Sequence, residues 1–286
     1  MSYQTILTHL NDSRRARRLL EYAVDFAQPF ETRVVALHVS ARLRLEGLPP
    51  PLNYIDVLKD LKFTLDEEVT HLRAIFEAVS SRAQFRGELR CLTAQRVNPA
   101  PIVMARARAA DLVIASQSDP RWTMSPMLDC SDDIALGSGR PVIVVPNDWT
   151  CIAPPKNILV AWNQSREAAR AMFDALPVLK NAETVELLQV DEEGKESGRN
   201  SQPDEEVLPA SAVGEVLAAH GVNPHIAILK ARREDVGEQI CRLATNQHAD
   251  LIVMGCYGHA RLREMVFGGA SRYLLRHMAV PVLFSH

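Results

Sequence analysis

Short apolar runs recur along the chain and alternate with segments in which apolar residues return every three or four positions. This alternation predicts β-strands separated by amphipathic helices. In the second half we predict strands at about 157–162, 184–190, 225–229, 250–254 and 280–285, and helices near 165–179, 205–220, 235–247 and 265–277. In the first half we predict strands near 4–10, 33–39, 85–92, 111–115 and 141–145.

Several predicted strands are apolar at consecutive positions, as in VVALHV, LVIAS and LIVMG. Strands of this kind are buried on both faces, as in a parallel sheet that helices cover on both sides. The sequence therefore predicts an α/β fold class with two tandem doubly wound domains. Each domain is expected to hold a five-stranded parallel sheet.

The two halves are copies of one unit. An apolar run ends at Asn-x-Ser both at Asn11 and at Asn163, and an Ala/Leu/Arg helix pattern follows each. Later, ADLVIAS is matched by ADLIVMG, and RPVIVVP by VPVLFSH. We predict a first domain over 1–147 and a second over 156–286, joined by the proline-containing linker PNDWTCIAPPK.

Composition narrows the class of protein. The chain has 286 residues and a formal net charge of −3, so it lacks the basic excess that binds nucleic acid. No apolar run approaches the roughly 20 residues of a membrane span, and the N-terminus lacks the order of a signal peptide. The five cysteines are scattered without a C-x-x-C pair. We therefore expect a cytoplasmic protein, with no nucleic-acid or membrane partner and no metal site.

A glycine-rich stretch follows the fourth strand of the second half. Gly255 and Gly258 are followed after nine residues by Gly268, and then by Gly269, Ala270 and Ser271 before the last helix. Glycines and a helix N-terminus present backbone N–H groups that hold a phosphate chain. The alternative is a tight turn with a close helix-packing contact.

This G-x2-G-x9-G pattern between ADLIVMG and VPVLFS resembles the universal stress protein family. The opening ILVAWNQSREAARA and the duplication resemble its tandem members, and the similarity extends over essentially the whole chain. The resemblance implies a strand order 3-2-1-4-5, ATP binding in some members, a role in survival under stress, and pairing through the fifth strands.

The resemblance also assigns residues to a nucleotide site. The family's ATP-binding loop corresponds to Gly255, Tyr257, Gly258 and Gly268, with Ser271 at the hydroxyl position. Two positions depart from the family pattern: Gly269 replaces a serine, and Asn163 replaces the acidic residue that meets the nucleoside. Val190 would flank the base.

The acidic run after the second strand of this half has two readings. Asp191, Glu192 and Glu193 are candidate magnesium ligands, and the alternative is a solvated loop.

The first half departs from the glycine pattern. Aligning Asp111 with Asp250 puts Ser116, Asp119, Asp129 and Cys130 at the positions of Gly255, Gly258, Gly268 and Gly269. Carboxylates at a phosphate site repel the ligand. We therefore expect nucleotide only in the second half, with the first half as a structural or regulatory partner.

Catalytic signatures are missing from the sequence, which has no G-x-S-x-G and no Walker sequence. We predict that the protein is not an enzyme. Cys256 is a candidate redox group or, alternatively, a small apolar filler, and the dispersed histidines are expected to be structural. His259, Arg261 and Arg263 could approach phosphate oxygens, and the alternative is a solvated loop.

The two fifth strands carry exposed edges that must be covered. We predict that residues 141–145 pair with 281–285 in an intrachain pseudo-dimer, and further assembly into a homodimer is compatible with this pattern. The leading function is a stress-response protein that binds ATP and regulates an unknown protein partner. The alternatives are a nucleotide-free interaction module, and an enzyme such as a nucleotidyltransferase or an electron-transfer flavoprotein.

Overall fold

The computed structural model describes residues 2–41, 54–83, 85–94, 98–150, 154–192, 208–232, 235–256 and 269–286. In chain order, the elements of the first half are β1 (Thr5–His9), α1 (Ser13–Ala27), the 3-10 turn η1 (Gln28–Phe30), β2 (Arg33–Ser40), α2 (Tyr54–Ala83), β3 (Gly87–Thr93), α3 (Ala100–Ala107), β4 (Leu112–Ser116), α4 (Ser125–Leu128), α5 (Ser131–Gly137) and β5 (Val142–Val145). Those of the second half are β6 (Asn157–Trp162), α6 (Arg166–Asp174), α7 (Leu176–Leu179), β7 (Thr184–Glu192), α8 (Ala210–Ala219), β8 (His225–Ala231), α9 (Val236–Asn246), β9 (Leu251–Gly255), α10 (Gly269–His277) and β10 (Val282–Ser285).

All ten strands form one sheet in the order β3-β2-β1-β4-β5-β10-β9-β6-β7-β8. Within each half the neighbouring strands are parallel and follow the expected order 3-2-1-4-5. The doubly wound fold predicted from the sequence is therefore confirmed for both halves.

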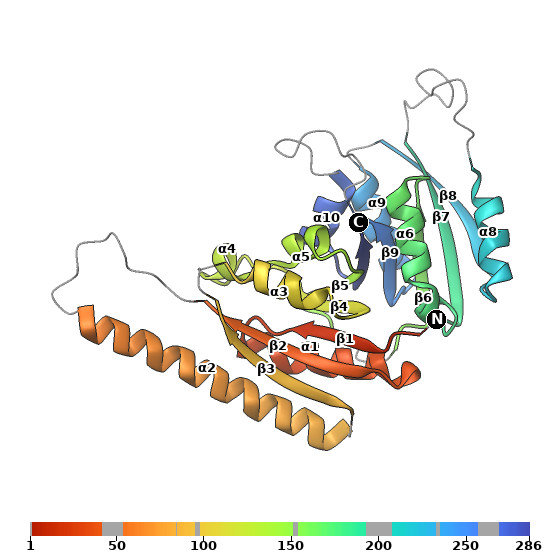
Figure 1. The fold of residues 1–286 in the computed structure, drawn as a ribbon. Helices are drawn as coiled ribbons and strands as arrows, with labels where there is room; N and C mark the ends of the chain where they lie inside the picture. Colours follow the sequence, from red (N-terminus) through yellow and green to blue (C-terminus); the bar gives the residue numbers. More distant parts are fainter. Residues whose placement is uncertain are drawn as a thin grey trace.

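The halves meet at the predicted pair of edges. β5 and β10 run antiparallel, with Ile143 opposite Leu283 and Val142 opposite Phe284. This pairing joins the two parallel sheets edge to edge (Figure 1). Each half thus covers the edge strand that the other would leave exposed.

Successive side chains of each strand point to opposite faces of the sheet, so the core consists of two apolar clusters, one on each face. Ile6 of β1 belongs to one apolar cluster and Leu7 to the other, and both clusters extend through both halves. Residues of α1, α2, α6, α7 and α8 pack into the first cluster, and residues of α3, α5, α9 and α10 into the second. The fold is therefore a three-layer α/β/α arrangement.

The predicted helix over 165–179 is in fact two helices, α6 and α7, which meet at Ala175. Pro177 explains the break, because proline has no backbone N–H to continue the α6 hydrogen-bond ladder. The longer middle section of the first half holds α2, which has 30 residues, whereas α8 at the corresponding place has 10.

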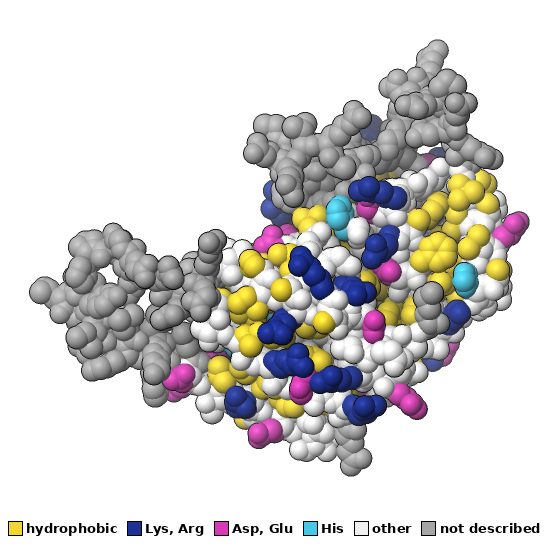
Figure 2. Space-filling view, in the orientation of Figure 1, with side chains coloured by type: hydrophobic (Ala, Val, Ile, Leu, Met, Phe, Trp, Pro, Cys, Tyr) yellow, Lys and Arg dark blue, Asp and Glu magenta, His cyan; other side chains and the backbone are white. Residues whose placement is uncertain are grey.

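The surface differs between the halves. The large apolar side chains that stand exposed among the described residues all belong to the second half: Phe173, Leu208, Val216, Ile226 and Ile228. Figure 2 shows apolar side chains gathered toward that side of the molecule, whereas Lys and Arg side chains cross the middle of the same face. None of the helices in the described ranges has both the length and the apolar character needed to cross a membrane.

Candidate functional site

Two matching carboxyl-to-backbone contacts show how the halves correspond. Asp111 Oδ2 accepts hydrogen bonds from the backbone N–H groups of Gln4 and Thr5. Asp250 Oδ2 accepts the same two bonds from Lys156 and Asn157. The residue before the fourth strand therefore ties down the start of the first strand in both halves, which supports aligning Asp111 with Asp250.

In each half the strand order reverses between the first and fourth strands, which are β6 and β9 in the second half. Ligands of doubly wound sheets bind beyond the carboxyl ends of the strands at such a point. Gly255 ends β9 there. A Cβ on Gly255 would lie 2.5 Å from the backbone N of Ala168 and 2.6 Å from the carbonyl C of Glu167. Glycine is thus required here because α6 packs directly on the strand end, whether or not a ligand approaches.

Asn163 follows β6 and forms a turn with Ser165. Its Oδ1 accepts hydrogen bonds from Ser165 Oγ at 2.7 Å and Ser165 N at 3.2 Å. Ser165 Oγ in turn accepts a bond from Ala168 N and caps α6. Gln164, which lies between Asn163 and Ser165, has a φ of 64°, a left-handed conformation that costs a non-glycine residue about 1 kcal/mol or more. Asn163 is exposed, and only its Nδ2 donors remain for a ligand.

The neighbouring strand β7 brings Val190 beside this turn. Val190 is half-buried and packs against the second apolar cluster, which leaves part of its side chain exposed. Asp191, one of the candidate magnesium ligands, accepts a hydrogen bond from Gln189 Nε2 at 2.8 Å. The side chain of Glu192 and all of Glu193 lie outside the described residues.

The start of α10 faces the same end of the sheet. Gly269 is its first residue and is exposed, whereas Ser271 is buried and hydrogen-bonded to Cys256. A Cβ on Gly237 of α9 would lie 3.1 Å from Ala270, so α9 supports α10 by close contact. The remaining residues of the predicted loop lie outside the described residues: Tyr257, Gly258, His259, Arg261, Arg263 and Gly268.

Glu167 is a buried acidic residue at this site that the sequence did not single out. Its side chain is 4% exposed and pairs with Arg166. Burial alone would raise the pKa of Glu167, but the side-chain hydrogen bond from Arg166, a backbone hydrogen bond and the charge of Arg166 leave that pKa lowered. The only sequence signal for Glu167 is that it occupies the position of Arg15 in the repeat.

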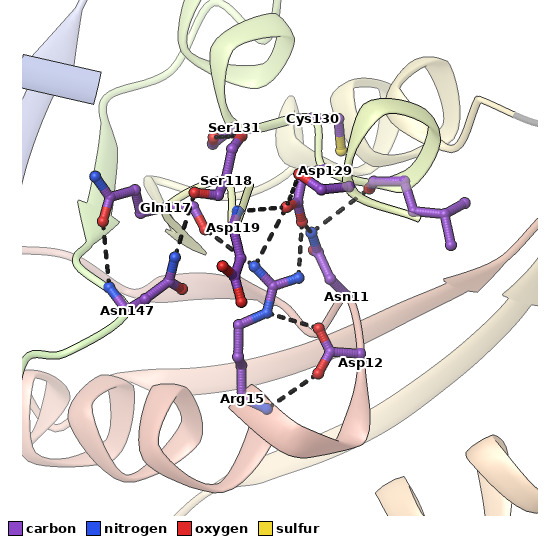
Figure 3. A network of polar contacts seen from close by, with 12 residues as sticks. Asn11, Asp12, Arg15, Gln117, Ser118, Asp119, Asp129, Cys130, Ser131 and Asn147 are labelled. Carbon is purple, nitrogen blue, oxygen red and sulfur yellow. Dashed lines mark hydrogen bonds and ion pairs between the residues drawn. The ribbon is translucent and has the colours of Figure 1, made fainter. Parts of the chain in front are cut away.

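The equivalent place in the first half holds an ion-pair network (Figure 3). The guanidinium of Arg15 bonds Asp129 at 2.8 Å, Asp12 at 2.6 Å and the carbonyl of Gln117 at 3.0 Å. It also lies 4.9 Å from the centre of the Trp122 ring. Although burial opposes it, the bonds to Asp129 and Asp12 raise the pKa of Arg15.

The structure corrects the expected role of the acidic residues in this half. We predicted that Asp119 and Asp129 would present repelling carboxylates, but Asp129 is neutralised by Arg15 and Asp119 by Arg121. The carboxylates of the first half are therefore paired with arginines, and they do not present the unpaired negative charge that we expected to repel a phosphate. Ser116 is buried, and its hydroxyl is without a hydrogen-bond partner among the described residues.

Three cysteines of the described residues and the two buried histidines are poor candidates for catalysis. Burial raises the pKa of the thiols of Cys130 and Cys256, and raises that of Cys241 to about 11, so all three are protonated at neutral pH. Burial lowers the pKa of His9 to about 3 and also lowers that of His38. The redox role considered for Cys256 therefore lacks the thiolate that it requires.

A cavity of about 320 Å³ lies between α1 and α2 and includes Arg14, Arg17 and His71 in its lining. The Glu68 carboxylate accepts bonds from both the N–H and the hydroxyl of Ser13 at this helix start, so the α1 N-terminus is already capped. Across the described ranges, His, Cys, Asp and Glu side chains do not gather into a group of three that could hold a metal ion.

Comparison with known proteins agrees with this architecture. Residues 155–286 match the model of the universal stress protein family. The universal stress protein Slr1230 of Synechocystis sp. is 29% identical over 86 residues, which cover 30% of this chain and 29% of that relative. The chain thus spans less than a third of the length of this curated relative.

Solved structures match the whole chain. A universal stress protein from Archaeoglobus fulgidus aligns with a TM-score of 0.67 and 20% identity, over 98% of this chain and 95% of its own. A functionally unknown protein from Pseudomonas aeruginosa aligns with a TM-score of 0.54 and 15% identity, over 99% of this chain and 92% of its own. Residues 155–286 therefore resemble the universal stress protein family, and the chain as a whole has the fold of a solved universal stress protein.

Proposed function

We propose that this is a cytoplasmic stress-response protein whose second half binds an adenine nucleotide, ATP in the first instance. The observation that carries the proposal is a contrast between the two halves at the aligned positions 129 and 268. In the first half this position holds the carboxylate of Asp129, whose side chain is 1% exposed. The aligned residue of the second half is Gly268, which has no side chain to fill it.

The described residues fit a nucleotide in part. The N–H groups of Gly269 and Ala270 begin α10 and so have no acceptor within that helix, and they would donate to phosphate oxygens. Gly255, Tyr257, Gly258 and Gly268 would form the loop around the phosphate chain, with Ser271 supporting it from the buried side. Asn163 Nδ2 would donate to a ribose hydroxyl or an adenine nitrogen, and Val190 would pack against the base.

Glu167 limits how the phosphates are bound. A buried carboxylate at the strand crossover repels a bare triphosphate, and this repulsion falls when the phosphates carry a cation. Magnesium would therefore arrive with the nucleotide, because the described residues do not preform a metal cluster. ATP would supply the negative phosphates for the N–H groups of α10 and the base that packs against Val190. We propose that binding regulates a protein partner and that no reaction is catalysed.

A nucleotide-free interaction module is the second candidate, and two observations favour it. Asn163 Oδ1 is committed to Ser165, and Gly255 is explained by its contact with α6. On this reading the glycines serve packing alone, and the second half is a scaffold like the first.

One experiment separates the two. The chain is purified without added nucleotide and denatured, and released small molecules are identified by chromatography and mass spectrometry, with ATP calorimetry as the follow-up. The proposal expects ATP or ADP at close to one per chain. It also expects Gly258→Asp to abolish binding without unfolding, whereas Asp119→Asn at the aligned position leaves affinity unchanged. No released nucleotide together with no calorimetric heat would favour the scaffold.

A further inference from the structure

The carboxylate of Asp129 is held as a bound anion would be held. It accepts five hydrogen bonds, from Asn11 Nδ2, Arg15 Nη1 and Nη2, Ser125 Oγ and the backbone N–H of Asp119. The distances to Arg15 Nη2, Ser125 Oγ and Asp119 N are 2.8, 2.7 and 2.8 Å. A guanidinium, a hydroxyl, a side-chain amide and a backbone N–H form the donor set that proteins use for oxyanions.

Arg15, the charged donor, is positioned by contacts that do not involve Asp129. Asp12 binds Arg15 Nε at 2.6 Å, the Gln117 carbonyl accepts from Arg15 Nη1 at 3.0 Å, and the Trp122 ring lies against the guanidinium. The Arg15 side chain is 8% exposed. Removing the Asp129 side chain would therefore leave the Arg15 guanidinium preorganised and largely buried.

Asp129 also aligns in sequence with Gly268, a glycine of the loop that we propose for nucleotide binding in the second half. Asp111 and Asp250 fix the alignment through their matching backbone contacts, and it equates Asp129 with Gly268. The residue equated with Arg15 is Glu167, so the two halves carry opposite charges at one position. The first half is thus the one with a fixed cation for an anion.

We propose that the first half retains an oxyanion site whose ligand is the carboxylate of its own Asp129. This half then stands permanently in the anion-bound arrangement and needs no dissociable ligand. A free oxyanion such as inorganic phosphate takes the place of the side chain once that side chain is removed. The inference concerns the first half alone and does not depend on nucleotide binding in the second.

The test uses full-length Asp129→Gly, which copies the residue found at position 268, and inorganic phosphate as the probe. Thermal unfolding is followed over a phosphate titration, with sodium chloride at matched ionic strength as the salt control. We expect the unfolding midpoint of Asp129→Gly to rise by about 2–4 °C more than that of the unchanged chain. The double variant Arg15→Gln/Asp129→Gly should lose this extra rise.

The unchanged chain and all variants keep the second half intact, so phosphate binding there cancels in the comparison. Equal responses of Asp129→Gly and the unchanged chain, or an undiminished response of the double variant, would overturn the proposal. If Asp129→Gly does not fold in chloride, the readout becomes refolding in phosphate, and a chain that stays unfolded at every concentration also overturns it. ATP binding by Gly258→Asp is measured separately, so the two proposals fail independently.

Discussion

Arg15 Nη2 lies 2.8 Å from Asp129 Oδ1, although the two residues are 114 positions apart in the chain. Arg15 belongs to the first helix, and Asp129 lies between α4 and α5 beyond the fourth strand. The pair therefore ties the first turn of α1 to the connection that follows β4. Both side chains are nearly buried, at 8% and 1% exposed.

Breaking this pair from one side should be costly. Arg15→Ala leaves the Asp129 carboxylate buried without its cation, which typically costs about 3–5 kcal/mol. The free energy of unfolding is measured by urea titration. The matched control is Lys156→Ala, which breaks the exposed Lys156–Glu183 pair and should cost less than about 1 kcal/mol. Equal losses in the two variants would contradict the buried role of Arg15.

Acid should destabilise the protein partly through His9. The folded state holds the pKa of His9 at about 3 because the ring is buried, whereas the ordinary value is 6.5. Between these values the unfolded chain binds the additional proton, so the free energy of unfolding falls as pH falls from 6.5 toward 3. One such group contributes a slope of about 1.4 kcal/mol per pH unit in that window.

The check is urea unfolding at several pH values for the unchanged chain and for His9→Leu. In His9→Leu the slope of the free energy of unfolding against pH should fall by most of the contribution of one histidine. The contribution of His38 should remain, because burial also lowers the pKa of that residue. An unchanged slope in His9→Leu would show that other groups control the acid sensitivity.

Position 255 should tolerate only glycine. In Gly255→Ala the new Cβ meets the backbone of α6, which cannot move as a flexible side chain would. Overpacking of this kind typically costs about 1–3 kcal/mol. Ser116→Ala is the control at the aligned position of the first half, where it removes a buried hydroxyl that lacks a partner. We expect the control to be neutral or stabilising, and equal destabilisation of both variants would contradict this account.

The sequence predicts the fold well because the fold is encoded locally and twice. Consecutive apolar residues mark each buried strand, and the repeated Asp111 and Asp250 mark the same contact in both halves. The pairing of 141–145 with 281–285 was predicted from the need to cover two edges, whereas the register that places Val144 opposite Val282 was not. The proposed domain boundaries and the residues of the nucleotide site remain predictions.

The candidate site is less predictable because its key contacts join distant parts of the chain. Nothing in the local sequence around Arg15 indicates that it binds Asp129, and a charge run is normally a solvated face. Gly255 illustrates a second limit. A glycine required by close helix packing and one required by a ligand look the same in sequence, and the packing requirement becomes visible only in the short distance from a Cβ at position 255 to Ala168.

The β5–β10 junction should make the two halves unfold together. Leu283 is fully buried where the strands pair, and Leu283→Ala should cost about 2–5 kcal/mol while leaving a single unfolding transition. The control is Ile228→Ala on the edge strand β8, where the side chain is 61% exposed and the cost should be below about 0.5 kcal/mol. Hydrogen exchange adds a direct reading, because the paired amides of 142–145 and 282–285 should exchange only on global unfolding. Fast exchange in both segments, or separate transitions for the two halves in the unchanged chain, would show that the junction does not couple them.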